Sequence, residues 1–70
     1  MKTKPNSNEE LAIRLCAAFI SIRMGYSLHG AYNQVKRQCP NGVGQTWTDL
    51  AAILLEDSRY IRATDELSKN

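Results

Sequence analysis

The sequence predicts an all-α protein, a compact domain of three or four helices. Apolar residues recur at helical spacing, no segment alternates apolar and polar residues as a strand would, and Gly and Pro gather where helices are expected to end. The chain has 70 residues, 43% hydrophobic and 23% charged, as is usual for one small folded domain. We expect residues 1–6 to form a flexible tail and residues 7–70 a single helical domain.

Residues 11–24 predict the first and most apolar helix. Ser7 and Glu10 have the spacing of a capping box before it, and no Gly or Pro interrupts it. Glu10, Arg14 and Ser21 form one narrow polar line, and nearly all other positions are apolar. A helix packed on one side of a core needs an apolar stripe only about 100° wide. Either this helix is central in the fold, or a second chain covers one of its faces.

Residues 28–39 predict a second helix with two distinct faces. Gly25 suits the end of the first helix, and Ser27 is a suitable N-cap for the second. The apolar face is formed by residues at helical spacing, namely Leu28, Ala31, Tyr32, Val35 and Cys39. The opposite face is polar, and we expect it to be exposed to solvent.

Residues 46–68 predict further helix, with Thr46 as the expected N-cap and Asp49 in the first turn. A polar run at residues 56–58 could interrupt it, with Asp57 or Ser58 capping a last short helix. The pattern leaves open whether these residues form one helix or two.

Charge is distributed unevenly around a formal net charge of +2. Residues 1–45 carry six cations and two carboxylates, whereas residues 46–70 carry three cations and five carboxylates. No apolar stretch approaches the roughly 18 residues of a membrane-spanning helix, and the start lacks the pattern of a secretory signal. Two cysteines, Cys16 and Cys39, are too few for a disulfide framework, so we expect free thiols, a cytoplasmic protein and no membrane partner.

Residues 18–37 resemble the helix-turn-helix of small transcriptional regulators, with Gly25 in the turn. In that motif the second helix enters the DNA major groove. Asn33, Gln34 and Arg37 would then face base edges, because amide and guanidinium groups read them. The predicted contacts to double-stranded DNA are Arg23, His29, Asn33, Gln34, Lys36 and Arg37. We expect a small regulatory protein that binds DNA through helix 28–39.

The alternative is a protein-binding adaptor or inhibitor that uses an exposed apolar face of the first helix. A symmetric homodimer is the commonest way to cover such a face, so we expect self-association. The predicted protein interface consists of Ile13, Ala17, Ile20, Met24 and Trp47.

The sequence predicts no enzyme, no cofactor, no metal and no small-molecule substrate. Its acidic pairs are adjacent in sequence, so their members point in different directions on a helix and do not converge on a substrate. Cys16, His29 and Cys39 include no close pair of metal ligands. The loop at residues 42–46 lacks the lysine that a phosphate-binding loop requires.

Overall fold

A computed structural model describes residues 7–69, apart from the side chains of residues 7 and 8, and this part of the chain folds into four helices with no strand. The all-α prediction is therefore confirmed. Residues 46–68 belong to two helices, and the predicted tail at residues 1–6 lies outside the described residues. The helices are α1 (Ser7–Met24), α2 (Leu28–Gln38), α3 (Gln45–Leu54) and α4 (Ser58–Ser68).

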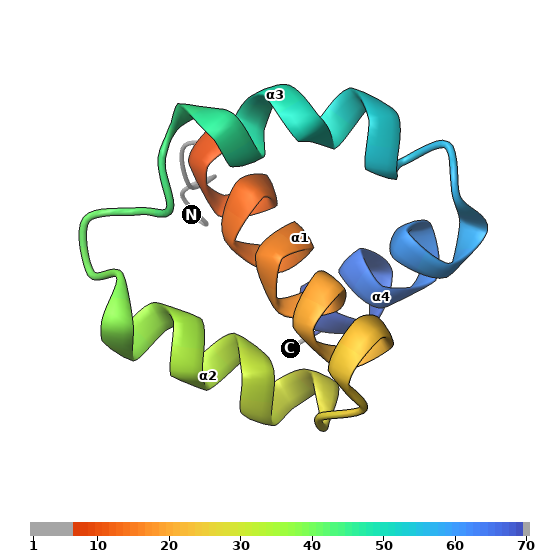
Figure 1. Cartoon of the computed structure of the whole chain (residues 1–70), viewed down its shortest axis with the longest axis horizontal. Helices are drawn as coiled ribbons and strands as arrows, with labels where there is room; N and C mark the ends of the chain where they lie inside the picture. The colour runs from red at the N-terminus through yellow and green to blue at the C-terminus, as the bar shows by residue number, and fades with distance from the viewer. Residues whose placement is uncertain (1–6, 70) are drawn as a thin grey trace.

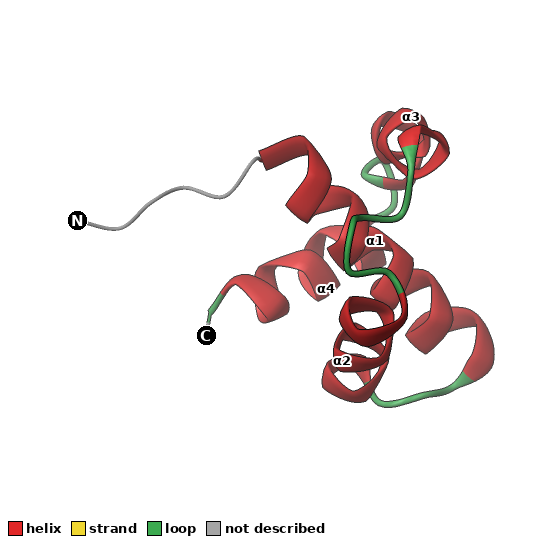
Figure 2. Cartoon of the chain, turned by 90° about the vertical axis from the view of Figure 1, so that its left-hand side faces the viewer, coloured by secondary structure: helices red, strands yellow, loops and turns green. Residues whose placement is uncertain are grey.

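Helix α1 is the centre of the fold. It packs against α2, α3 and α4, and α2 also touches α4. Figures 1 and 2 show α1 running between α3 on one side and α2 on the other. Five of the nine buried apolar residues in the described part of the chain belong to α1. Its nearly continuous apolar surface thus has partners within the chain, which agrees with the prediction that this helix is central in the fold.

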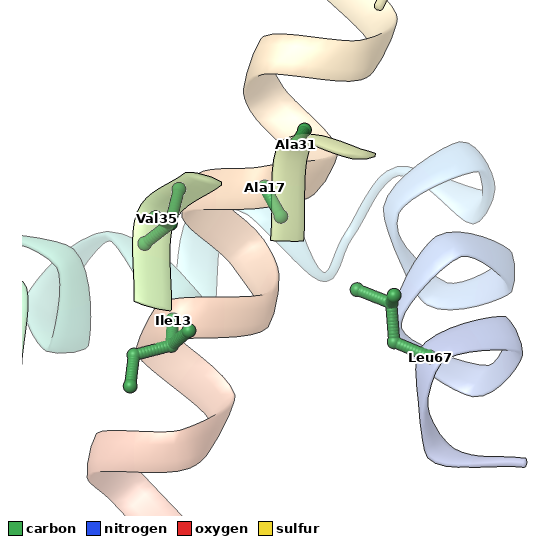
Figure 3. Close-up of a cluster of buried hydrophobic side chains, with 5 residues drawn as sticks. All are labelled: Ile13, Ala17, Ala31, Val35 and Leu67. Carbon is green, nitrogen blue, oxygen red and sulfur yellow. The ribbon is translucent and has the colours of Figure 1, made fainter. Parts of the chain in front are cut away.

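The contact between α1 and α2 is built from small and branched side chains. Ile13 and Ala17 of α1 form a buried cluster with Ala31 and Val35 of α2, and Leu67 of α4 completes it (Figure 3). Ala17 and Ala31 are at most 1% exposed. Because alanine adds so little volume, the two helix backbones can approach closely here.

A second cluster joins α1 to the other two helices. Leu15 and Ala18 are fully buried and pack with Tyr60 of α4. Partly buried side chains from α3, including Ala51 and Leu54, lie against this cluster. The two clusters therefore occupy different sides of α1, which explains why its sequence shows no single apolar stripe. Among the described residues, no helix has both the length and the apolar character that crossing a membrane requires.

The boundary between α1 and α2 follows the sequence prediction. Gly25 has a φ of +79°, the left-handed conformation that favours glycine after a helix. The Ser27 hydroxyl accepts a hydrogen bond from the Gly30 N–H at 3.3 Å and caps α2. In addition, the Ser21 hydroxyl donates to the Tyr26 carbonyl at 2.7 Å. These contacts fix the short connection between α1 and α2.

The start of α4 agrees with the sequence prediction, whereas the start of α3 differs from it. Asp57 is the N-cap of α4, and its carboxylate accepts from the Arg59 N–H at 2.9 Å and from the Arg59 guanidinium at 2.7 Å. These hydrogen bonds lower the pKa of Asp57. The prediction that Thr46 caps the third helix is wrong. Gly44, with a φ of +99°, is the N-cap, because it turns the chain two residues earlier than a threonine cap would.

Candidate nucleic-acid interface

The outer face of α2 carries three of the residues predicted to bind DNA. Ala31 and Val35 turn the opposite face into the core, so helical periodicity directs Asn33, Gln34 and Arg37 outward. All three are exposed. We call these three residues the outer stripe of α2. Two amides and one guanidinium can hydrogen-bond both to base edges and to phosphate oxygens.

Arg37 is the cation of this stripe, and within the described residues it forms no ion pair. It lies in the last turn of α2, where a positive charge interacts favourably with the helix dipole. The guanidinium is thus available to an external anion without first breaking an internal contact.

Lys36 is exposed but engaged within the chain. Its Nζ lies 4.0 Å from Oε1 of Glu10 and 5.6 Å from the centre of the Tyr32 ring. Both contacts draw the ammonium toward α1 and away from the outer stripe. We therefore expect Lys36 to contribute less to anion binding than Arg37.

Glu10 is the centre of a polar network that joins three helices. Its Oε2 accepts the Tyr32 hydroxyl at 2.6 Å and Nε of Arg14 at 3.0 Å. Nη1 of Arg14 donates in turn to the Ser68 hydroxyl of α4 at 2.7 Å. Sequence reasoning missed this network, since Glu10 and Tyr32 are 22 residues apart. Only the four-residue spacing of Glu10 and Arg14 could have indicated a part of it.

Tyr32 differs from an exposed tyrosine because of this network. Partial burial, the hydrogen bond to Glu10 and the charge of Glu10 together raise the pKa of Tyr32. The phenol therefore keeps its proton and its role as donor across the physiological range. Its hydrogen bond to Glu10 links α2 to α1, so the hydroxyl is not free to bind a ligand.

The remaining two predicted DNA contacts lie away from the outer stripe. Nε2 of His29, in the first turn of α2, is 3.8 Å from the Glu66 carboxylate of α4. The Arg23 guanidinium of α1 lies 5.6 Å from the centre of the Phe19 ring. Phe19 makes an edge-on contact with Trp47 of α3, with ring centres also 5.6 Å apart. Arg23 thus belongs to the side of α1 that faces α3.

The residues predicted to form a protein interface fall into three groups. Ile13 and Ala17 are buried under the chain's own helices and present no free surface. Ile20 and Trp47 are half-buried. Met24 remains 64% exposed at the end of α1. The pattern identified these residues as apolar, but it could not indicate that α2 and α4 would cover the first two.

The residues considered for metal binding do not assemble. No group of three or more His, Cys, Asp or Glu side chains that could hold a metal ion occurs within the described part of the chain. Cys16 and Cys39 are both free and half-buried. Burial, and to a smaller degree the nearby Cys39, raises the pKa of the Cys16 thiol, so its reactive thiolate form is disfavoured at neutral pH.

A shallow cleft of about 420 Å³ lies between the start of α1 and the start of α3. Gly44, which has a positive φ, lines the cleft, and a Cβ at the neighbouring Gly42 would lie 2.5 Å from Oε2 of Glu9. The acidic Glu9 side chain disfavours a phosphate in this cleft. The lining residues are Glu9, Ala12, Asn41, Val43, Gly44, Gln45 and Thr48.

No protein-family model matches the chain, and searches of curated proteins and of solved structures likewise give no match. A functional proposal must therefore come from the chain's own surface chemistry.

Proposed function

We propose that this chain is a small, non-enzymatic regulatory protein of the cytoplasm that binds double-stranded DNA through the outer stripe of α2. The observation that carries the proposal is the exposure of Asn33, Gln34 and Arg37 on a helix anchored from behind by Ala31 and Val35. An α-helix can enter the major groove, where exposed amides and a guanidinium can hydrogen-bond to base edges.

The arrangement of α1 and α2 supports this proposal. The two helices are joined by the short connection at Gly25, as in helix-turn-helix units, and α1 holds α2 against the body of the domain. In this unit α2 would lie in the major groove. Asn33 and Gln34 would hydrogen-bond to adenine edges, and Arg37 to guanine or to a phosphate.

The charge distribution also supports a polyanionic partner. No acidic residue occurs from Leu11 to Thr48, a stretch that contains all of α2. The acidic groups that approach α2, Glu10 and Glu66, come from α1 and α4 and lie beside Lys36 and His29, not on the outer stripe. A phosphate backbone could therefore approach Arg37 with little repulsion.

The salt dependence of duplex binding tests this function. Fluorescence anisotropy with a labelled duplex should give a log Kd that rises with log salt concentration. Arg37→Gln should weaken binding and reduce that slope by about 1, and Lys36→Gln/Arg37→Gln should reduce it by up to about 2. Circular dichroism would show that each variant keeps its helices.

Arg62→Gln is the matched control, because it removes the same charge from an exposed residue of α4 that, like Arg37, forms no ion pair within the described residues. Figure 1 shows that α4 begins on the opposite side of the domain from the end of α2. The control should bind like the wild type. Absence of duplex binding at low salt, or an equal loss of slope in the control, would contradict the proposal.

The second candidate function is a protein-binding adaptor or inhibitor. What favours it is the exposure of Met24 and Tyr26, at 64% and 61%, next to the turn between α1 and α2. Its surface is smaller than the sequence predicted, because Ile13 and Ala17 are enclosed. Binding to a protein through this turn would be lost in Met24→Ser/Tyr26→Ser but kept in Arg37→Gln, the reverse of what DNA binding predicts.

A further inference from the structure

The described residues include four exposed large apolar side chains, and apart from Ile61 of α4, at 42%, they lie at two separate places. Met24 and Tyr26 lie at the end of α1, at 64% and 61% exposure, and Ile53 lies near the end of α3 at 63%. Isolated exposed apolar residues are common on protein surfaces. These residues are distinguished by the charges beside them, which are of opposite sign at the two places.

The first place is basic. Arg23 directly precedes Met24 and is exposed, and no acidic residue occurs between residues 11 and 48. Its guanidinium rests on the Phe19 ring and, within the described residues, has no ion-pair partner. We call Arg23, Met24 and Tyr26 the basic corner.

The second place is acidic. Asp49 precedes Ile53 by one helical turn on α3, and Glu56 lies in the turn that follows the end of the helix at Leu54. Both carboxylates are exposed, and no Lys or Arg occurs between residues 38 and 58. We call Asp49, Ile53 and Glu56 the acidic stripe.

We propose that a second copy of this chain docks here, with the basic corner of each copy on the acidic stripe of the other. Each place offers an apolar centre with a charged edge, and the two edges are complementary in sign. Figure 1 shows the α1–α2 turn and the end of α3 at the lower and upper parts of the same half of the molecule. A two-fold axis between them makes the contact twice in each dimer.

This interface differs from the one that the first helix's pattern predicted. It uses Met24 but leaves Ile13 and Ala17 in the core. It also leaves the outer stripe of α2 uncovered, so a dimer could still present both of its α2 helices to DNA. The proposal does not depend on DNA binding, and its test contains no DNA.

Sedimentation equilibrium of the full chain tests the proposal through a charge exchange. The wild type should show a mass that rises above the 7.9 kDa monomer as concentration increases. Arg23→Glu alone and Glu56→Arg alone each place like charges together, and each should raise the dissociation constant at least about tenfold.

An equimolar mixture of Arg23→Glu and Glu56→Arg chains should recover association, because residues 23 and 56 then carry opposite charges at both contacts of the mixed dimer. Asp65→Arg, which makes the same change on exposed α4, is the control and should associate like the wild type. Circular dichroism checks that each variant is helical. A wild type that stays monomeric at millimolar concentration, or a mixture that associates no better than its components, would overturn the proposal.

Discussion

Helices α1 and α3 are both rich in apolar residues, yet they are buried to very different extents. Leu15, Ala17 and Ala18 of α1 have no accessible surface, whereas every side chain of α3 remains at least partly accessible. The difference comes from position. α1 packs on three helices, while α3 packs chiefly on α1. Apolar composition alone therefore does not indicate how much a helix contributes to stability, and we expect α1 to be the stable centre of the fold and α3 its most weakly held helix.

Truncating one leucine in each helix gives the strongest test of the claim that α1 contributes more to stability than α3. Leu15→Ala empties a fully buried site and should lower the free energy of unfolding by about 2–5 kcal/mol. Leu50→Ala, in half-buried surroundings on α3, should lower it by about 1 kcal/mol. Urea denaturation followed by circular dichroism measures both values. Equal losses would show that the two helices are equally important to the core.

Two glycines near the α1–α2 turn should respond in opposite directions to alanine. Gly25 has a positive φ, so Gly25→Ala should cost about 1–2 kcal/mol of unfolding free energy. Gly30 lies inside α2, where a Cβ would meet the Ser27 side chain at an ordinary 3.5 Å, so Gly30→Ala should stabilise by up to about 1 kcal/mol. Thermal denaturation of the two variants tests this. If Gly30→Ala lost stability as Gly25→Ala does, the finding that α2 has room for a Cβ at residue 30 would be contradicted.

The link between α1 and α2 should also show a pH dependence. The native state holds the Tyr32 proton more tightly than the unfolded chain, so this stabilisation is complete below the ordinary tyrosine pKa of about 10 and is lost as pH rises through the raised native pKa. Tyr32→Phe should cost about 1 kcal/mol near neutral pH. It should also remove this part of the decline in stability at high pH.

Tyr26→Phe is the matched control for that experiment, because Tyr26 is exposed. Urea denaturation at a series of pH values would compare the three proteins. A decline in Tyr32→Phe as steep as in the wild type and in the control would show that the hydrogen bond to Glu10 does not stabilise the fold.

Local signals in the sequence predicted much of the fold. Gly25 and Ser27 indicated the end of α1 and the start of α2, because each acts through its own backbone or side-chain chemistry. The polar run that contains Asp57 and Ser58 likewise indicated the start of α4, and Asp57 is the residue that caps it. Thr46 misled the prediction, because Gly44, two residues before it, has the backbone conformation that begins α3.

The candidate sites were harder to predict, because periodicity shows which face of a helix is apolar but not what covers it. The pattern placed Ile13 in an interface, and the fold encloses it between α1, α2 and α4. It treated Lys36 as a free cation, although Glu10 and Tyr32 hold it. Both outcomes depend on contacts between segments that are distant in sequence. The exposure of Asn33, Gln34 and Arg37 follows from periodicity within one helix.

Chemical-shift mapping with a DNA duplex tests the central functional claim most directly. In amide and side-chain spectra of the isotope-labelled chain, adding duplex should shift the signals of the outer stripe, Asn33, Gln34 and Arg37, while signals of α3 stay in place. The side-chain NH₂ groups of Asn33 and Gln34 should move most, since they would hydrogen-bond to base edges. Shifts confined to α3, or no shifts at low salt, would contradict the claim that the outer face of α2 binds DNA.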